Sequence, residues 1–192
     1  MELQTHRLLL VAGTSSLGHA EIEDRIRFAM LLNADVPPSW PPPLNDVESM
    51  LWFTRYIESN PNSDGWVKWY FLLKRQGELP LAVGNGGFKG KANPSGTVEV
   101  GYAILEEYQR KGLATEAVNA LIRWALSHDE VNRVIAHTFP ELRPSIRVME
   151  KCGLTYGGKG DEEGTIMYEF PRERLLQSAP NSHRYHEDPL RH

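Results

Sequence analysis

The hydrophobic positions along the chain change period several times, and each change predicts a new element. Residues 6–13 form an apolar run typical of a buried strand, and a helical pattern follows at about residues 19–33. Prolines between residues 36 and 46 forbid a helix there and predict an extended, stiff loop. Asn45 and Glu48 then have the spacing of a capping box, which predicts the start of another helix.

Three strand-like segments come next, at residues 66–75, 79–90 and 96–105. The turns between them are short, so we expect antiparallel neighbours. The period then changes to that of an amphipathic helix at about residues 115–127. The apolar residues at helical spacing there are Val118, Leu121, Ile122 and Ala125.

A strand at 133–139, a short helix at 144–153 and a strand at 164–170 complete the pattern. This order predicts one α/β domain over residues 1–171, with a mixed, mostly antiparallel sheet. Residues 172–192 are rich in Arg, His, Pro and Asn, and we expect a polar tail that is mobile or loosely docked.

Composition narrows the function classes. The 192 residues are 41% hydrophobic and 24% charged, as in a soluble globular protein. A net charge of −4 argues against a nucleic-acid binder. The sequence shows neither an apolar run long enough to span a membrane nor the pattern of a secretory signal, so a cytoplasmic protein is expected. Cys152 is the single cysteine, so no disulfide is expected. Three of the seven histidines fall in the polar tail and the others lack ligand spacing, so we expect no metal site.

One short stretch, YQRKGLATEA at residues 108–117, combines small residues and cations where a strand turns into a helix. Gly112 permits positive φ or close approach, and Ala114 leaves the helix start uncovered. The free N–H groups and the dipole of a helix N-terminus bind anions, so this turn predicts a phosphate site. The alternative is a plain loop capped by Thr115 with exposed cations.

Two other phosphate motifs fit less well. The P-loop string does not occur in the sequence. GNGGFKG at residues 84–90 is one residue out of register for a dinucleotide fold, and the KANPSG that follows cannot begin a helix. A strand end and hairpin with close backbone approach explains these glycines better.

The ordered blocks THRLLL, VEVGYAILEEYQRKGLATEAVNALIRWAL and AHTFPELRPSIRVMEKCGL, with GNGGFKG, span most of residues 5–170. Together they resemble the GCN5-related N-acetyltransferase (GNAT) superfamily, in particular its branch similar to ribosomal-protein N-terminal acetyltransferases. The family signature Q/R-x-x-G-x-G/A appears as Gln109, Gly112 and Ala114. The resemblance implies a splayed, mostly antiparallel sheet of six to seven strands flanked by about four helices.

The resemblance also implies acetyl-coenzyme A as co-substrate, without a metal. The backbone of Ala103, Ile104 and Leu105 would pair with the pantetheine arm. The pyrophosphate would rest on the turn, whose residues are Gln109, Arg110, Lys111, Gly112, Leu113, Ala114 and Thr115.

Two residues are candidates for the chemistry. Glu99 aligns with a glutamate that some family members use as general base; alternatively it is a salt-bridged strand carboxylate. Ser145 aligns with a position beside the coenzyme sulfur, and it could equally cap its helix. Shortly before it, where many members have an asparagine that contacts the coenzyme, this chain has Arg143 followed by Pro144.

Cys152 suggests an acyl-enzyme, but it lies beside Gly153 with no histidine nearby, which favours a buried small side chain. Among the tryptophans, Trp52 and Trp69 are expected in the core, and Trp40 in its proline loop is expected to line an acceptor pocket.

The leading hypothesis is therefore an acetyltransferase that moves acetyl from acetyl-coenzyme A to a primary amine in a ternary complex. A non-catalytic acyl-coenzyme A sensor and a nicotinamide-dependent oxidoreductase are the alternatives. Protein N-terminus, lysine side chain and small-molecule amine all stay open as acceptor. Dimers are common in the family, so a homodimer is compatible with the resemblance.

Overall fold

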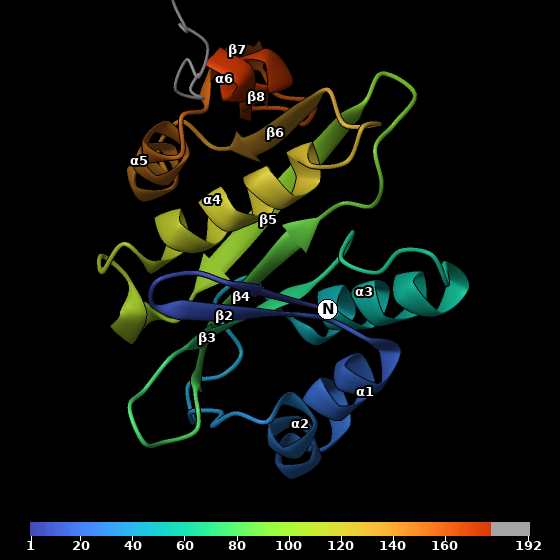
Figure 1. Cartoon of the computed structure of the whole chain (residues 1–192), viewed down its shortest axis with the longest axis vertical. Coiled ribbons are helices and arrows are strands. Elements are labelled where there is room, and N and C mark those ends of the chain that lie inside the picture. The colour runs from blue at the N-terminus through green and yellow to red at the C-terminus, as the bar shows by residue number, and fades with distance from the viewer. Residues whose placement is uncertain (178–192) are drawn as a thin grey trace, which may run out of the picture.

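The computed structural model describes residues 1–177 and shows one mixed sheet with helices on both faces (Figure 1). The strands are β1 Glu2–Gln4, β2 Leu8–Ala12, β3 Trp69–Leu73, β4 Leu81–Phe88, β5 Thr97–Ile104, β6 Arg133–Thr138, β7 Thr155–Lys159 and β8 Ile166–Pro171. The α-helices are α1 Ser15–Glu23, α2 Arg25–Leu32, α3 Val47–Ser59, α4 Leu113–Leu126, α5 Arg143–Lys151 and α6 Arg172–Gln177.

The sheet has the strand order β1-β2-β3-β4-β5-β6-β8-β7. Every neighbouring pair is antiparallel except β5 and β6, which are parallel. The mixed α/β fold expected from the sequence is confirmed. The described residues contain eight strands and six α-helices rather than six to seven and about four, because the short β1 and the exposed, glycine-containing β7 carry weak sequence signals.

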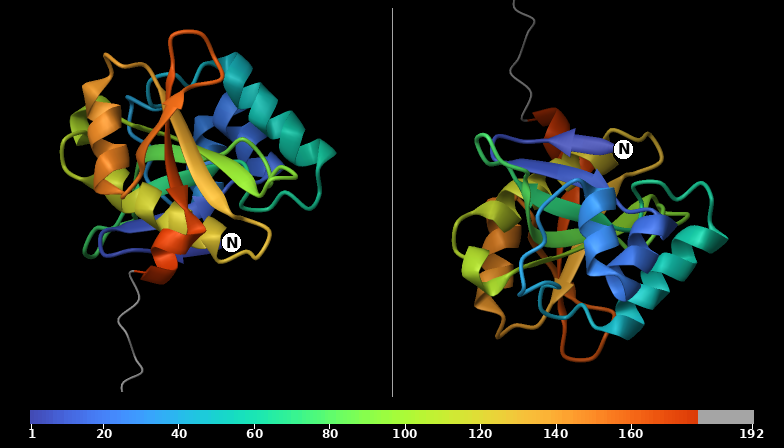
Figure 2. Two further views of the ribbon diagram at one scale, coloured as in Figure 1. Left: turned by 90° about the horizontal axis from the view of Figure 1, so that it is seen from above. Right: turned by 90° about the horizontal axis from the view of Figure 1, so that it is seen from below.

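The two faces of the sheet differ in what covers them (Figure 2). On one face, α4 and α5 bury the main core, to which each central strand contributes alternate residues. On the other face, α1 and α2 cover only the β3–β4 half, where Tyr70, Leu72 and Ala82 meet Phe28. Strand β3 is therefore apolar on both sides, which explains the continuous run WYFLL.

The β5 strand is fully covered on one face and open at its middle on the other. Val98 and Val100 lie in the main core under α4, whereas Gly101 on the opposite face is exposed. A Cβ added to Gly101 would meet nothing within 4 Å. The surface of the sheet around Gly101 is therefore uncovered, beyond the apolar cluster that α1 and α2 form with β3 and β4; we call this surface the open floor.

The glycines of residues 84–90 serve the contact between β4 and β5. A Cβ on Gly84 would lie 2.5 Å from the Ala103 carbonyl oxygen, and one on Gly86 would lie 2.6 Å from that of Gly101. A turn, not a helix, follows β4. Close backbone approach, as expected, explains this motif.

Two helix starts differ from the sequence prediction. The helix expected at 19–33 is two helices, because Asp24 leaves the helical region (φ −149°) and its side chain accepts from the N–H groups of Ile26 and Arg27. Asp46, not Asn45, caps α3 and accepts from the Ser49 N–H. Asn45 instead accepts a hydrogen bond from the Asn85 side chain, 2.9 Å away.

Of the two tryptophans expected in the core, one is buried and the other is not. Trp69 is fully buried, as expected, and its Nε1–H donates to the Gly65 carbonyl. The prediction for Trp52 is wrong: its side chain is 49% exposed and contacts Phe53 and Tyr56 on the same helix. The apolar pattern of α3 continues onto its outer face, and sequence periodicity alone does not separate the two faces there.

The expected tail begins with a helix. In α6, Arg172 donates from Nε to the Val131 carbonyl at 2.7 Å, and Leu175 packs against the main core. The remainder of the expected tail, 178–192, lies outside the described residues. Over residues 1–177, no helix is long and apolar enough to cross a membrane.

Candidate active site

Strands β5 and β6 form a fork. They pair in parallel at only three positions, the last of which joins Glu99 to Ile135. Beyond that pair β5 continues to Ile104 beside β4 alone, and β6 continues beside β8 alone. One edge of β5 therefore borders a gap that opens at Glu99.

The direction of the backbone groups on β5 follows from two hydrogen bonds to the other side. The Glu99 carbonyl accepts from Lys89 N–H at 3.0 Å, and Leu105 N–H donates to the Val83 carbonyl at 2.9 Å. Because peptide groups alternate along a strand, Val100, Tyr102 and Ile104 direct theirs toward the gap. The Ile104 carbonyl already accepts from the Gln109 side chain at 3.0 Å.

The phosphate turn lies at the open end of this fork. Gly112 is the N-cap of α4 and has φ 77°, and the exposed Arg110 before it also has positive φ, 60°. The helical hydrogen bonds start at Glu116 N–H, which donates to the Gly112 carbonyl. The N–H groups of Leu113, Ala114 and Thr115 are thus left over at the helix start, as an anion site requires.

A clamp fastens this turn to the N-terminal strands. Glu116 accepts from the Thr5 hydroxyl (2.6 Å), from the Arg7 backbone N–H (2.6 Å) and from Arg7 Nε (2.7 Å). The other end of the Arg7 guanidinium donates to the Lys111 carbonyl at 2.8 Å. The THRLLL block therefore fixes the shape of the phosphate turn, a role that sequence reasoning missed because the partners are more than 100 residues apart.

Glu116→Ala is expected to destabilise the fold by about 1–3 kcal/mol, because it leaves partly buried donors without an acceptor. Burial alone would raise the pKa of Glu116, but hydrogen bonds from Thr5 and Arg7 outweigh it and lower that pKa below its ordinary 4.5. The stabilisation is therefore present above pH 4.5 and is lost as pH falls through the folded pKa. Urea denaturation at several pH values measures this.

The exposed Glu106 provides a matched control, since Glu106→Ala removes a nearby carboxylate outside the clamp. We expect a change within about 0.5 kcal/mol for that variant. Equal losses in both variants would contradict the clamp.

Ser145 lies across the gap from β5. It is the third residue of α5, which has no side-chain cap, so the helix-cap reading of this serine is not supported. Its Oγ is 3.2 Å from the Tyr102 hydroxyl, which also donates to the Ser145 carbonyl at 3.1 Å. Burial raises the pKa of Tyr102 to about 12, so it is a neutral O–H donor at physiological pH. Sequence reasoning missed Tyr102, although its position on β5 is two residues before Ile104.

Glu99 sits at the vertex of the fork with its side chain 18% exposed. Its Oε1 is 2.7 Å from Lys89 Nζ and 3.1 Å from His137 Nδ1. The salt-bridged reading of this carboxylate and a catalytic one are thus both compatible with its contacts. His137 was not singled out from the sequence, because it lies on another strand with no spacing motif.

Three further candidates from the sequence, Cys152, Trp40 and Arg143, lie outside the fork vertex. Cys152 is buried (4% exposed), as expected, and burial raises its pKa to about 12. Trp40 packs against Phe28 and Tyr70, and its Nε1 donates to Glu21 at 3.1 Å, so its contacts anchor the proline loop to α1, α2 and β3. Arg143 is exposed at the first position of α5.

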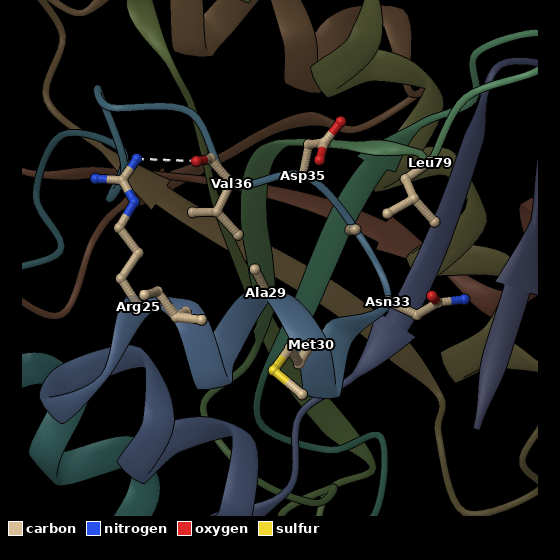
Figure 3. Close-up of a pocket in the computed structure, with 9 residues that line it drawn as sticks. Arg25, Ala29, Met30, Asn33, Asp35, Val36 and Leu79 are labelled. Atoms are coloured by element: carbon tan, nitrogen blue, oxygen red, sulfur yellow. Dashed lines mark hydrogen bonds between the residues drawn. The ribbon is translucent and has the colours of Figure 1, made fainter.

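An open groove elsewhere on the surface does not include these residues (Figure 3). It lies beside α2, where Arg25 donates to the Val36 carbonyl and the exposed Met30 and Leu79 border it. None of the predicted site residues lines this groove.

Comparison with known proteins decides the family. The model of the acetyltransferase (GNAT) domain matches residues 17–155, more than half of the chain. The chain belongs to the GNAT acetyltransferase family. YjdG of Bacillus subtilis (strain 168), described as an uncharacterized N-acetyltransferase, is 28% identical over 162 residues, covering 84% of this chain and 90% of that protein.

Solved structures share the GNAT fold. A ribosomal-protein-S5-alanine acetyltransferase from Vibrio fischeri matches with a TM-score of 0.60 at 18% identity, over 90% of this chain and 97% of that one. The microcin C7 self-immunity acetyltransferase MccE, solved with acetyl-CoA and AMP, matches with a TM-score of 0.58 at 18% identity, over 87% and 93%. The family match and the N-acetyltransferase relative, rather than these distant structures, make the protein an acetyltransferase.

Proposed function

We propose that this GNAT protein transfers the acetyl group of acetyl-coenzyme A directly to a primary amine, within a ternary complex. The observation that carries the proposal is the fork between β5 and β6, which joins a free strand edge to an open helix N-terminus. One edge supplies backbone donors and acceptors for an extended arm, and the helix start supplies N–H groups for a phosphate.

The coenzyme would lie along this path. Of the three residues expected to pair with pantetheine, Ile104 directs its peptide groups to the gap, whereas the N–H of Leu105 is engaged by Val83. The pyrophosphate would meet the N–H groups from Gly112 to Thr115, with Arg110 and Lys111 as exposed cations beside them. The MccE complex shows a neighbour of the same fold with acetyl-CoA bound, which supports this ligand.

Acetyl transfer needs three groups from the protein: a base for the amine, a donor for the oxyanion and a donor for the thiolate. An amine with a pKa of about 10.4 arrives as ammonium, so Glu99 would take one proton and free the lone pair for attack on the thioester carbon. The tetrahedral oxyanion would be stabilised by an N–H group of the β5 edge. When it collapses, the C–S bond breaks and the amine nitrogen gives up its second proton to the departing thiolate, directly or through solvent. The Ser145 hydroxyl, beside Tyr102, would stabilise that thiolate with a hydrogen bond.

Direct transfer fits this site better than an acyl-enzyme. Cys152 is the single thiol of the chain, and its raised pKa of about 12 leaves almost no thiolate at neutral pH. Its Sγ also lies 3.5 Å from the Thr115 carbonyl, to which it donates within the core. The buried thiol therefore serves packing under the phosphate turn.

The amine acceptor would enter over Gly101, on the open floor beside Glu99. Gly101→Leu is expected to raise the acceptor KM or lower turnover at least about tenfold, because the side chain occupies the floor while an ordinary strand conformation tolerates it. Coenzyme affinity should stay near normal. Initial rates against acceptor concentration, beside calorimetric titration with coenzyme A, measure both effects.

Gly101→Ala serves as the graded control for that variant, since one methyl group projects into the same open space without filling it. A smaller defect is expected for Ala than for Leu. If both variants acetylate the acceptor as well as the parent protein does, the acceptor does not pass over Gly101.

The proposal as a whole is tested by coenzyme binding and thiol release. Coenzyme A should raise the melting temperature, since a ligand that binds the folded state stabilises it by mass action. Incubation of acetyl-coenzyme A with peptides, lysine derivatives and small amines should release free thiol with at least one of them. Binding without release across the panel would favour the sensor alternative, and absence of binding would remove the proposal.

A further inference from the structure

We propose that His137 is a positioning residue for the catalytic carboxylate: its Nδ1–H donates to Glu99 Oε1 and leaves Oε2 to face the acceptor amine. This inference rests on the proposed function for its kinetic consequence. The pairing itself, and the tautomer it requires, do not depend on any substrate.

The register of the two strands places these side chains together. Glu99 is opposite Ile135 in the last pair of β5 and β6, and His137 follows two residues later on the same face of β6. Because β5 and β6 part just there, the imidazole enters the vertex of the fork. Its Nδ1 lies 3.1 Å from Glu99 Oε1.

The surroundings of the ring decide which nitrogen carries the proton. An ionised carboxylate only accepts hydrogen bonds, so the nitrogen that faces it must be the donor. The other nitrogen, Nε2, is buried and has no hydrogen-bond partner among the described residues. A proton on Nε2 would leave a buried donor unpaired and set two lone pairs against each other at Glu99. The geometry therefore favours the Nδ1–H tautomer.

The charged groups around the ring come from three elements. Glu99 on β5 is the nearest, Lys89 after β4 contacts the same oxygen, and Asp161 between β7 and β8 lies 4.0 Å from Nε2. On β8 the residue opposite His137 is the uncharged Met167. Asp161 is 90% exposed, so solvent screens it, and Glu99 is the dominant partner.

Lys89 Nζ and His137 Nδ1 thus both lie within ion-pair distance of the same oxygen of Glu99, but the two side chains differ in rigidity. The Lys89 side chain is 61% exposed and flexible, so its contact contributes little. The His137 side chain is only 12% exposed and is held between strands. His137 therefore fixes the carboxylate rotamer, and Oε2 makes none of the hydrogen bonds or ion pairs of the described residues.

Three replacements of His137 test this role. Asparagine places an amide N–H near the position of Nδ1, glutamine places one nearer Nε2, and leucine supplies volume alone. We expect His137→Asn to keep kcat within about threefold, and His137→Leu and His137→Gln to lower kcat about ten- to hundredfold, the worth of a hydrogen bond to a charged group. Coenzyme Kd should not change. Lys89→Met, which removes the exposed partner, should lose less than His137→Leu.

A double-mutant cycle shows whether His137 acts through Glu99. In the Glu99→Gln background, His137→Leu should cost little further activity, because the group it positions is already gone. Additive losses would show an independent role and overturn the proposal, as would equal activity of His137→Asn and His137→Leu.

A measurement without substrate separates this inference from the proposed function. Long-range ¹H–¹⁵N correlation spectra of the full chain assign the ring tautomer of His137, and we expect the neutral ring to carry its proton on Nδ1. A proton on Nε2 overturns the positioning role even if the protein acetylates amines well. Conversely, an Nδ1–H ring that responds to Glu99→Leu, in a protein that acetylates no amine, keeps the pairing and removes only the proposed function.

Discussion

Replacing Glu99 with glutamine is expected to lower kcat by about 10²–10⁴-fold, the usual contribution of a positioned general base. Glutamine keeps the size of the side chain and its hydrogen-bonding oxygen, so the fork should keep its shape. Coenzyme affinity should stay near normal, because the phosphate turn and the free edge of β5 lie beyond Glu99. Thiol release in steady state and calorimetric titration with coenzyme A measure the two quantities separately.

The defect should shrink as pH rises. More of the acceptor amine is then already neutral and attacks without a base. A pH–rate profile of the variant and the parent, with one good acceptor, is therefore more informative than a single rate. A constant ratio across pH would point to a structural contribution of Glu99 in place of proton transfer.

Glu169 on β8 offers a matched control two strands away from Glu99. Like Glu99 it is a partly buried strand glutamate paired with a cation, here Arg133 at 3.0 Å. Glu169 lies opposite Ile135 on the far side of β6 from Glu99, so Glu169→Gln removes an ion pair one strand beyond the fork, and a small stability change with normal kcat is expected. Normal turnover in Glu99→Gln would move the base to a water molecule held by backbone groups. Lost coenzyme binding would make Glu99 a structural residue.

The sequence predicted most of the sheet because its strands carry strong local signals. The five central strands β2 to β6 are apolar on at least one face and are separated by turn residues or helical segments. Gly112 was also predictable, since a positive φ at a helix N-cap favours a residue without Cβ. Local chemistry determined these features, so one sequence was enough to find them.

The side-chain partners were not predictable in this way. His137 meets Glu99 only because β5 and β6 stop pairing after Glu99 and Ile135, and no single-sequence pattern states that register. Glu116 reaches Thr5 and Arg7 across the whole domain. Tyr102 pairs with Ser145 across the gap, from a strand position that reads as ordinary core. Tertiary contacts with long sequence separation explain each of these.

The second large effect is expected at the phosphate turn, where Gly112→Val should abolish the melting-temperature rise that coenzyme A gives the parent protein. A valine Cβ at this N-cap would lie 3.4 Å from the Arg7 guanidinium, within the turn on which the pyrophosphate is proposed to bind. At a hundredfold excess over Kd, the lost stabilisation is about 2.7 kcal/mol. Differential scanning fluorimetry with and without coenzyme A measures it.

Backbone strain must be separated from steric exclusion, because Gly112 has φ +77° and any side chain there is strained. Gly77, in the turn between β3 and β4, has φ +73° with nothing within 4 Å of an added Cβ. Gly77→Val should therefore lower the melting temperature of the free protein while the full coenzyme-induced rise is retained.

Gly112→Ala, with less strain and less bulk, covers the case in which valine prevents folding. If Gly112→Val or Gly112→Ala folds and still shows the parent's coenzyme shift, the pyrophosphate does not rest on this turn.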